Sequence, residues 1–462
     1  MRTFPINIPS LLQNLGIQRS YQDVMTIKNR EDLVRFQRKH LESLLLHAYQ
    51  KVPYYTRVLN EIRLISGGKV DFDNFNKIPI LTKELMKKHR TDLLSTDHKS
   101  RHSFTSSTGG STGEPTLFTQ DREYVRWGRV ANRYYYDKIL GINEGSLKKI
   151  ILWGSHDEYL HNQKDIVSRS LYSLTNTILL NSFKMTDTDL VQYISIINKF
   201  KPDLIRGYAS SLFHLCQFIE FNKFQTHHPK IVISSAETLT DEMRNTIEKV
   251  WGTKVFNFYG SRETNNLGGE CLQGLIHTLG FHEYVEIIKE DGSNAVDGEE
   301  GRVVVTNLHN YAMPFIRCDL GDLAVRGPDI CSCGSPLPTL RSVTGRSNQI
   351  LRGCNGIPMS PCFVPYLFYP GCDDSNEGKV QYQKIKQYQL IQESKDHISV
   401  KIIVDPNSGK SDFEYIIANI KQALGQEMNV QLNLVDDIEP LPSGKKLYVL
   451  SKVEPTVSPN GL

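Results

Sequence analysis

The segment Thr108-Gly-Gly-Ser-Thr-Gly-Glu-Pro-Thr116 combines three glycines with four hydroxyl side chains in nine positions. Glycine lets the backbone turn so that several N–H groups converge on one anion, and the hydroxyl groups add further donors. The segment is not a Walker loop, because Glu114 and Pro115 follow Gly113 where that loop ends in Gly-Lys-Ser/Thr. It predicts either a phosphate-binding loop or a glycine- and serine-rich surface loop. The candidate phosphate-binding residues are Thr108, Gly109, Gly110, Ser111, Thr112 and Gly113.

A second group of residues has the types that bind zinc. Cys331 and Cys333 are separated by one residue, and Cys271 with His277 would complete a set of three thiolates and one imidazole. One intervening residue is fewer than the usual two to four, and the halves lie sixty residues apart, so reduced core thiols remain the alternative. His282 is a competing ligand.

Alternating strands and helices must position these groups. Apolar runs predict buried strands at 150–153, 231–233 and 255–259, with helical spacing between them at 211–221 and 241–250. This order indicates an α/β core with mainly parallel strands. Before it, apolar residues from Leu33 to Ala48 predict a helix, and Thr82 is the expected cap of another.

The pattern changes in the second half of the chain. From Tyr284 onward, alternating strands around two Asp-Gly turns predict antiparallel β structure. After residue 347 comes a small α+β unit with strands at 398–404 and 430–434 and a helix at 412–425. We therefore expect a large N-terminal domain, residues 1–347, and a small mobile C-terminal domain, residues 348–462. The segment from Pro358 to Cys372 is expected to be a loop packed on the core.

Composition limits the class of protein. The 462 residues carry a formal net charge of +3, and Lys and Arg are spread along the chain, which disfavours a nucleic-acid partner. The sequence shows no apolar stretch long enough for a membrane span and no signal-peptide pattern at its start. A cytoplasmic protein with free thiols is the expectation. The sequence gives no indication of the oligomeric state.

The segment from Thr108 to Pro115 resembles the signature phosphate loop of the acyl-adenylate-forming superfamily. The resemblance continues in order over roughly residues 35 to 450 and is greatest to the phenylacetate–CoA ligase branch. Several of its motifs are most similar to those of the CapK-like and coenzyme F390 synthetase-related members. The other segments that carry it are His47 to Tyr55, Ile78 to Lys83, Gly207 to Ser211, Tyr259 to Glu263, Asn310 to Arg317, Gly321-Asp322, Gly345-Arg346 and Pro442 to Lys446.

The resemblance implies roles for individual residues. Tyr259 would pack on adenine, and Glu263 would hold Mg²⁺ between phosphates. Asp322 would accept hydrogen bonds from the ribose hydroxyls, and Arg346 would contact ribose or phosphate. Lys445 would bridge the acid's carboxylate and the α-phosphate, although Lys446 beside it competes for that role. Nucleotide contacts are also expected from Ser235, Ala236, Glu237, Gly260 and Ser261.

The implied reaction converts ATP and a small carboxylic acid to an acyl-adenylate and pyrophosphate, then transfers the acyl group to an acceptor. That acceptor is CoA, an amine or a glycan hydroxyl; the alternatives are adenylyl transfer to a cofactor hydroxyl and a non-catalytic nucleotide-binding scaffold in capsule polysaccharide biosynthesis. The chain departs from the family at Cys318, where a Tyr is usual, and at Asn348 and Gln349, one of which would serve as the hinge in place of Asp. Because of these departures, adenylation is a safer inference than transfer of the acyl group to an acceptor.

Overall fold

A computed structural model describes residues 8–107, 117–153, 176–182, 185, 187–346, 351–354, 358–359, 364–368, 384–406, 408–439 and 449–453. Its helices are α1 (Ile8–Val24), α2 (Arg30–Lys51), α3 (Pro53–Glu61), α4 (Lys83–Lys88), α5 (Arg122–Tyr134), α8 (Asp187–Phe200), α9 (Ala209–Phe221), α10 (Asp241–Trp251), α11 (Val364–Leu367) and α13 (Glu414–Leu424). None of the described helices has the length and apolar character needed to cross a bilayer.

The centre of the fold is an eleven-stranded sheet in the order β12-β13-β14-β15-β11-β10-β9-β8-β7-β5-β6. Its parallel half runs from β9 to β6, and the other half is antiparallel, as the sequence predicts. The parallel strands are β5 (Lys149–Trp153), β6 (Thr177–Asn181), β7 (Leu204–Tyr208), β8 (Ile231–Ser235) and β9 (Val255–Tyr259). The antiparallel strands are β10 (Gly268–Glu270), β11 (Ile276–Thr278), β12 (Glu283–Ile288), β13 (Glu300–Asn307), β14 (Cys318–Arg326) and β15 (Thr339–Arg346).

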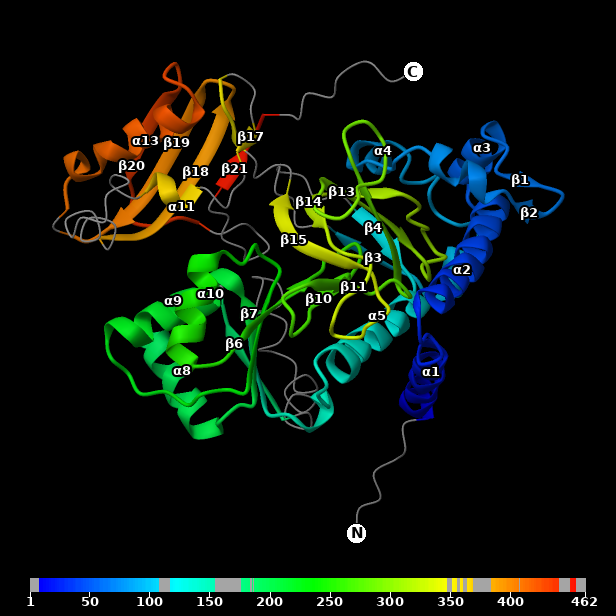
Figure 1. The fold of residues 1–462 in the computed structure, drawn as a ribbon, viewed down its shortest axis with the longest axis horizontal. Coiled ribbons are helices and arrows are strands. Elements are labelled where there is room, and N and C mark those ends of the chain that lie inside the picture. The colour runs from blue at the N-terminus through cyan, green and yellow to red at the C-terminus, as the bar shows by residue number, and fades with distance from the viewer. Residues whose placement is uncertain are drawn as a thin grey trace, which may run out of the picture.

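Helices α8, α9 and α10 cover one face of the parallel half (Figure 1). The buried side chains of that interface alternate along the strands, with Ile150, Leu152, Ile205, Val232 and Val255 on the helical side. The opposite face packs Leu204, Ile233, Phe256 and Phe258 against the end of α5 and the π-helical turn η3 (Tyr135–Ile139). Since alternate residues of a strand point to opposite faces, the strand residues that do not face the helices α8, α9 and α10 lie together on the face toward α5 and η3.

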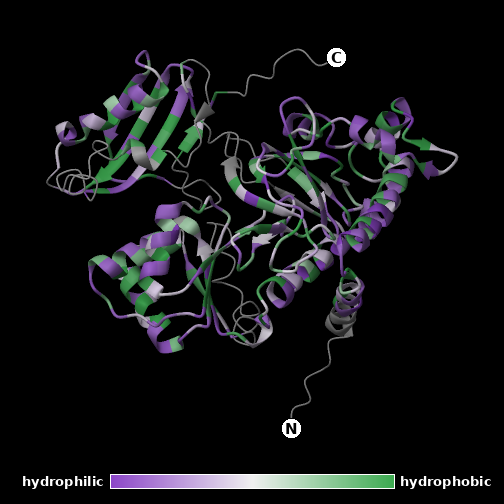
Figure 2. Cartoon of the chain, viewed as in Figure 1, coloured by the Kyte–Doolittle hydropathy of each residue, from purple (hydrophilic) through white to green (hydrophobic). Residues whose placement is uncertain are grey.

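The N-terminal helices wrap the antiparallel half. In α2 the buried residues recur at helical spacing, and the side chain of Asn29 caps the helix by accepting from Asp32 N–H. Figure 2 shows hydrophilic residues predominating along the rest of this helix. Thr82 caps α4 through Leu85 N–H, which confirms the predicted cap. Two short hairpins lie nearby: β1 (Ile65–Ser66) with β2 (Lys69–Val70), and β3 (Phe104–Ser107) with β4 (Leu117–Gln120).

A second sheet, in the order β20-β19-β18-β21, forms a separate body with α13 (Figure 1). Its strands are β18 (Ile385–Ser394), β19 (His397–Val404), β20 (Asn429–Leu434) and β21 (Val449–Ser451), and its core is distinct from those of the large sheet. The predicted strands and helix of this unit are confirmed, whereas a domain boundary near residue 348 stays a prediction.

The predicted loop from Pro358 to Cys372 is wrong where the structure describes it. Pro358–Met359 is strand β17, paired with β16 (Leu351–Arg352), and α11 follows. Val364, Leu367 and Phe368 are buried in the core of the second sheet. Apolar packing in that core therefore accompanies helical structure at 364–367, where the composition of the segment suggested a loop.

Candidate functional site

Tyr259 and Asp322, sixty-three residues apart, are joined by a hydrogen bond. The Tyr259 hydroxyl donates to Asp322 Oδ2 at 2.7 Å, and both residues are less than a tenth exposed. Arg346 is the backbone register partner of Asp322 on the neighbouring strand. The pairing of β14 with β15 and the hydrogen bond from Tyr259 thus bring together three residues that the family resemblance assigns to one nucleotide. The structure describes the backbone of Arg346 but not its side chain.

The turn after Tyr259 requires glycine at its first position. A Cβ on Gly260 would lie 2.0 Å from the carbonyl oxygen of Asn265, so any other residue would force the turn open. Ser261 closes the turn with its hydroxyl, which accepts from Thr264 N–H and lies 3.1 Å from the Thr264 hydroxyl. Gly260 and Ser261 therefore shape the backbone that carries Glu263.

Three side chains from outside the turn hold the backbone of Glu263. Its carbonyl accepts hydrogen bonds from Gln120 Nε2 at 3.3 Å and Asn307 Nδ2 at 3.1 Å, and Tyr124 Oη lies 3.2 Å from it. Glu263 itself is only 5% exposed. These contacts on one carbonyl fix the backbone of this carboxylate-bearing residue, which is what a residue assigned to Mg²⁺ requires.

Gln120 also relates this turn to the predicted phosphate loop. The loop residues Thr108 to Thr116 lie outside the described residues, but Ser107 and Leu117 at its two ends are register partners. Gln120, at the far end of β4, donates to the carbonyls of Arg262 and Glu263. The hairpin that carries the loop is therefore attached to the Glu263 turn. Lys445 and Lys446 also lie outside the described residues, so their predicted role stays a prediction.

The end of β8 supplies the next predicted nucleotide contacts. The hydroxyl of Ser235 donates to the Phe258 carbonyl at 3.1 Å. Ala236 follows with φ +69°, a conformation that costs a non-glycine residue about 1 kcal/mol or more. Together with Glu237 these residues leave the sheet at the carboxyl ends of its parallel strands, the edge at which open α/β sheets bind ligands.

A buried network behind Glu263 was not predicted. The Tyr124 hydroxyl donates to Glu283 Oε1 at 2.6 Å, and Asn307 Nδ2 lies 3.5 Å from the same oxygen. His282, stacked on Tyr124, has its Nε2 3.5 Å from that oxygen. Complete burial raises the pKa of the Glu283 carboxyl well above its usual range and lowers that of His282 to about 3, so burial favours the neutral form of both groups. The network packs directly behind the turn that carries Glu263.

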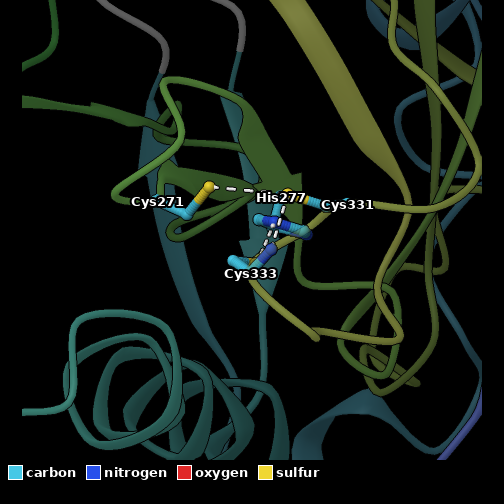
Figure 3. Close-up of side chains that lie close together, drawn as sticks. All are labelled: Cys271, His277, Cys331 and Cys333. Carbon is cyan, nitrogen blue, oxygen red and sulfur yellow. Dashed lines mark hydrogen bonds between the residues drawn. The ribbon is translucent and has the colours of Figure 1, made fainter.

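The predicted metal ligands lie together (Figure 3). The ligand atoms of Cys271, His277, Cys331 and Cys333 are all within 4.8 Å of one another. The Cys271 and Cys331 sulfurs are 3.8 Å apart, and tetrahedral coordination with Zn–S bonds of about 2.3 Å would place two sulfurs about 3.8 Å apart. His282 is outside this group, so the structure selects His277 over the competing ligand.

The environment of the cluster suits metal-bound thiolates. His277 Nδ1 lies 3.1 Å from the Leu337 carbonyl, which accepts its proton and leaves Nε2, 3.2 Å from Cys333 Sγ, as the ligand atom. Burial raises the pKa of Cys271, but contact with His277 and hydrogen bonds from two backbone N–H groups outweigh it and lower that pKa. Burial and contact with Cys331 raise the pKa of Cys333 to about 12. Three mutually close thiols resist ionisation together unless a cation joins them.

Comparison with known sequences gives a consistent set of relatives. Residues 376–452 match the family described as the CapK C-terminal domain. Protein CapK of Staphylococcus aureus is 24% identical over 453 residues, covering 94% of this chain and 92% of CapK. The phenylacetate–coenzyme A ligase of Thermus thermophilus is 25% identical over 354 residues, covering 73% of this chain and 76% of the ligase.

Solved structures share the fold. A crystal structure of 2-hydroxyisobutyryl-CoA ligase in the postadenylation state, in complex with R3-HIB-AMP, has a TM-score of 0.66 at 16% identity and covers 92% of this chain and 90% of that one. An open conformation of that ligase, in complex with 2-HIB-AMP and CoA, has a TM-score of 0.56 at 17% identity, with 88% of each chain covered. The similarity extends over both sheets.

Proposed function

We propose that this chain, as a member of the acyl-adenylate-forming superfamily, activates a small carboxylic acid and passes the acyl group to CoA. The premise is its similarity to phenylacetate–CoA ligases and to CapK. The chain is an ATP-dependent adenylate-forming enzyme. The identity of the acid and of the acceptor is the proposed part. A cytoplasmic location likewise stays a prediction.

The observation that carries the nucleotide site is the 2.7 Å hydrogen bond from Tyr259 to Asp322. It holds the tyrosine ring beside a carboxylate, the acceptor type suited to ribose hydroxyls. From Tyr259 the chain passes through the tight turn at Gly260 to Glu263, whose carbonyl accepts from Gln120 of the hairpin that carries the phosphate loop. This order along one turn supports adenosine at Tyr259 and phosphates near Glu263.

The proposed chemistry is displacement at the α-phosphorus. A carboxylate oxygen of the acid forms a bond to that phosphorus while the bond to pyrophosphate breaks, and no proton is transferred in the step. Two anions must approach, so positive groups and N–H donors have to surround them. We assign this task to the loop at Thr108–Gly113 and to Lys445, with Arg346 on the ribose side.

Two metals fit the residues present. Glu263 would hold Mg²⁺, which would neutralise charge on the departing pyrophosphate. Cys271, His277, Cys331 and Cys333 would hold a structural Zn²⁺, for which their donor atoms and spacing are suited. The zinc group is assigned no part in the chemistry, because four protein ligands leave a tetrahedral ion no open position.

The acceptor is proposed from the relatives. Four similar proteins are named phenylacetate–coenzyme A ligase. CoA is bound in the open conformation of 2-hydroxyisobutyryl-CoA ligase. The similarity to CapK keeps an amine or a glycan hydroxyl as alternative acceptors, along with adenylyl transfer to a cofactor hydroxyl. Asn348 and Gln349, whose position in the predicted hinge bears on the second step, lie outside the described residues.

ATP–pyrophosphate exchange with a panel of carboxylic acids tests the proposal. An acid that is adenylated will drive labelled pyrophosphate into ATP, whereas a nucleotide-binding scaffold incorporates none. The matched variant replaces Ser111 and Thr112 with Ala, and losing charged hydrogen bonds worth about 1.5–3 kcal/mol each should lower kcat/KM for ATP tenfold or more. Exchange by no acid, or unchanged ATP kinetics in the variant, would contradict the assignment.

A further inference from the structure

Arg206 is a charged residue inside a strand of the parallel sheet. It lies at the third position of β7, two residues before the strand ends at Tyr208. Its neighbours Ile205 and Gly207 face the helical layer: Ile205 belongs to that core, and a Cβ on Gly207 would lie 3.2 Å from Leu212 of α9. Arg206 therefore points to the other face, the one shared with Phe258 and the end of α5.

Aromatic rings surround the guanidinium group on that face. Its central carbon lies 4.6 Å from the ring centre of Phe258 and 5.9 Å from that of Trp153. Nη2 is 3.5 Å from the Ser235 hydroxyl, and the guanidinium also hydrogen-bonds the buried hydroxyl of Tyr136. The residue is half-buried. Cation–π contacts favour a cation here but replace only part of the hydration that burial removes.

No carboxylate within the described ranges forms an ion pair with Arg206. The carboxylates that act on the neighbouring tyrosines Tyr135 and Tyr136 are Glu270 and Glu144. Glu270 is held by Arg244 at 2.9 Å and by Asn257 N–H at 2.7 Å. Glu144 is held by Lys149 at 3.2 Å and by Asn132 at 3.0 Å. Arginine stays protonated in proteins, so the half-buried guanidinium has the chemistry of an anion receptor.

We propose that Arg206 binds a second carboxylate on the acid substrate, so that the enzyme adenylates a dicarboxylic acid. This inference rests on the proposed function and names its substrate class. The reacting carboxylate must reach the α-phosphate at the strand ends, beside Tyr259 and the Glu263 turn. Arg206 branches from β7 two residues earlier, about 6.6 Å along a strand, beside the rings of Phe258 and Trp153.

The charge change during the reaction also favours the distal carboxylate. The reacting carboxylate loses its charge when it becomes a mixed anhydride, so an arginine bound to it would stabilise the starting state more than the transition state. A distal carboxylate keeps its charge throughout. The planar guanidinium can therefore hold it by two parallel hydrogen bonds from binding to product.

The test compares each diacid with its own monomethyl ester, for chains of four to eight carbons and for a phenyl-bridged diacid. ATP–pyrophosphate exchange is measured for the wild type, Arg206→Leu and Arg206→Lys. The wild type should prefer the diacid of the best-fitting pair by about tenfold to a hundredfold in kcat/KM, the value of charged hydrogen bonds. Arg206→Leu should lose that preference while still adenylating the ester, and Arg206→Lys should restore part of it.

Two results would overturn the inference. One is a wild type that adenylates diacid and ester of every pair equally or prefers the ester. The other is an equal loss for both members of a pair in Arg206→Leu, which would place the arginine on the reacting carboxylate or give it a structural role. Either result leaves the proposed function standing, because exchange still occurs.

A binding measurement separates the inference from the proposed function and does not need a folded Arg206 variant. Titration of the wild type with the diacids should change the fluorescence of Trp153, and Trp153→Phe identifies its signal among the three tryptophans. A saturable change with a diacid but not with its ester supports Arg206 as the receptor even if no acid supports exchange, in which case the proposed function fails alone. Equal changes with both compounds, or none, contradict the inference.

Discussion

The hydrogen bond between Tyr259 and Asp322 allows the nucleotide assignment to be tested from both sides of the contact. Tyr259→Phe removes a donor to a buried carboxylate at 2.7 Å, a contact worth about 1.5–3 kcal/mol if Asp322 is ionised. Asp322→Asn keeps an acceptor oxygen for Tyr259 but lacks the charge that binds ribose hydroxyls strongly. If Asp322 binds ribose, we expect Asp322→Asn to raise the KM for ATP by about tenfold or more.

The assay compares ATP with 2′,3′-dideoxy-ATP in pyrophosphate exchange, for the wild type and for each variant. The wild type should lose about tenfold or more with the dideoxy compound, and Asp322→Asn should lose much less, since its ribose contact is already weakened. Tyr259→Phe should keep the full difference between the two nucleotides, which makes it the matched control. If the dideoxy penalty is the same in wild type and Asp322→Asn, Asp322 does not contact the ribose and serves only to hold Tyr259.

Three further predictions concern metal, catalysis and pH. The purified chain should contain about one zinc ion, and Cys331→Ser should release it. Cys216→Ala, which changes a buried cysteine in α9, is the control and should keep the metal. Metal-free protein prepared without chelator would contradict this prediction. Lys445→Ala should lose about 10²–10³-fold in adenylation yet still consume prepared acyl-adenylate in the presence of acceptor; loss confined to Lys446→Ala would move the role by one residue. The raised pKa of buried Glu283 means that its neutral form stabilises the fold at low pH and that this contribution falls as pH rises above the usual glutamate range. Relative to the wild type, Glu283→Gln should therefore gain unfolding free energy, by up to about 1.4 kcal/mol per pH unit, as the pH rises above the usual glutamate range; a difference in urea-unfolding free energy that does not change with pH would refute this.

Local patterns predicted much of the fold because the strands concerned carry their own signal. The composition of the run from Val255 to Tyr259 is enough to predict a strand, and the Asp-Gly turns predict the antiparallel half of the sheet. The strand β7 was harder, since Arg206 and Gly207 interrupt its apolar run. Its arginine is tolerated there only because Phe258 and Trp153 face it from other strands, and no spacing in the sequence records that.

The supports of the site were the least predictable part. Tyr124 and Asn307 reach the carbonyl of Glu263 from positions 139 residues before it and 44 residues after it. Contacts of this kind depend on how α5 and β13 pack, whereas sequence reasoning assigns roles to single motifs. The four residues of the cluster could be predicted as a set because closely spaced cysteines are rare in this chain, and the structure brings their ligand atoms together. The choice of His277 over His282 needed the chain path, which places His277 on β11 opposite the thiols.

The path of β10 relates the proposed zinc cluster to the proposed nucleotide site. Gly268 is the register partner of both Tyr259 on β9 and Thr278 on β11, and Cys271 follows directly after β10. The Tyr135 hydroxyl fixes this strand by donating to the Glu270 carbonyl. A metal that joins Cys271 and His277 would therefore fasten the turn end of the β10–β11 hairpin, and the other pairing of β10, with β9, aligns Tyr259. Because this coupling runs through backbone position and not through a reacting group, loss of the metal should weaken ATP binding more than it slows the chemical step.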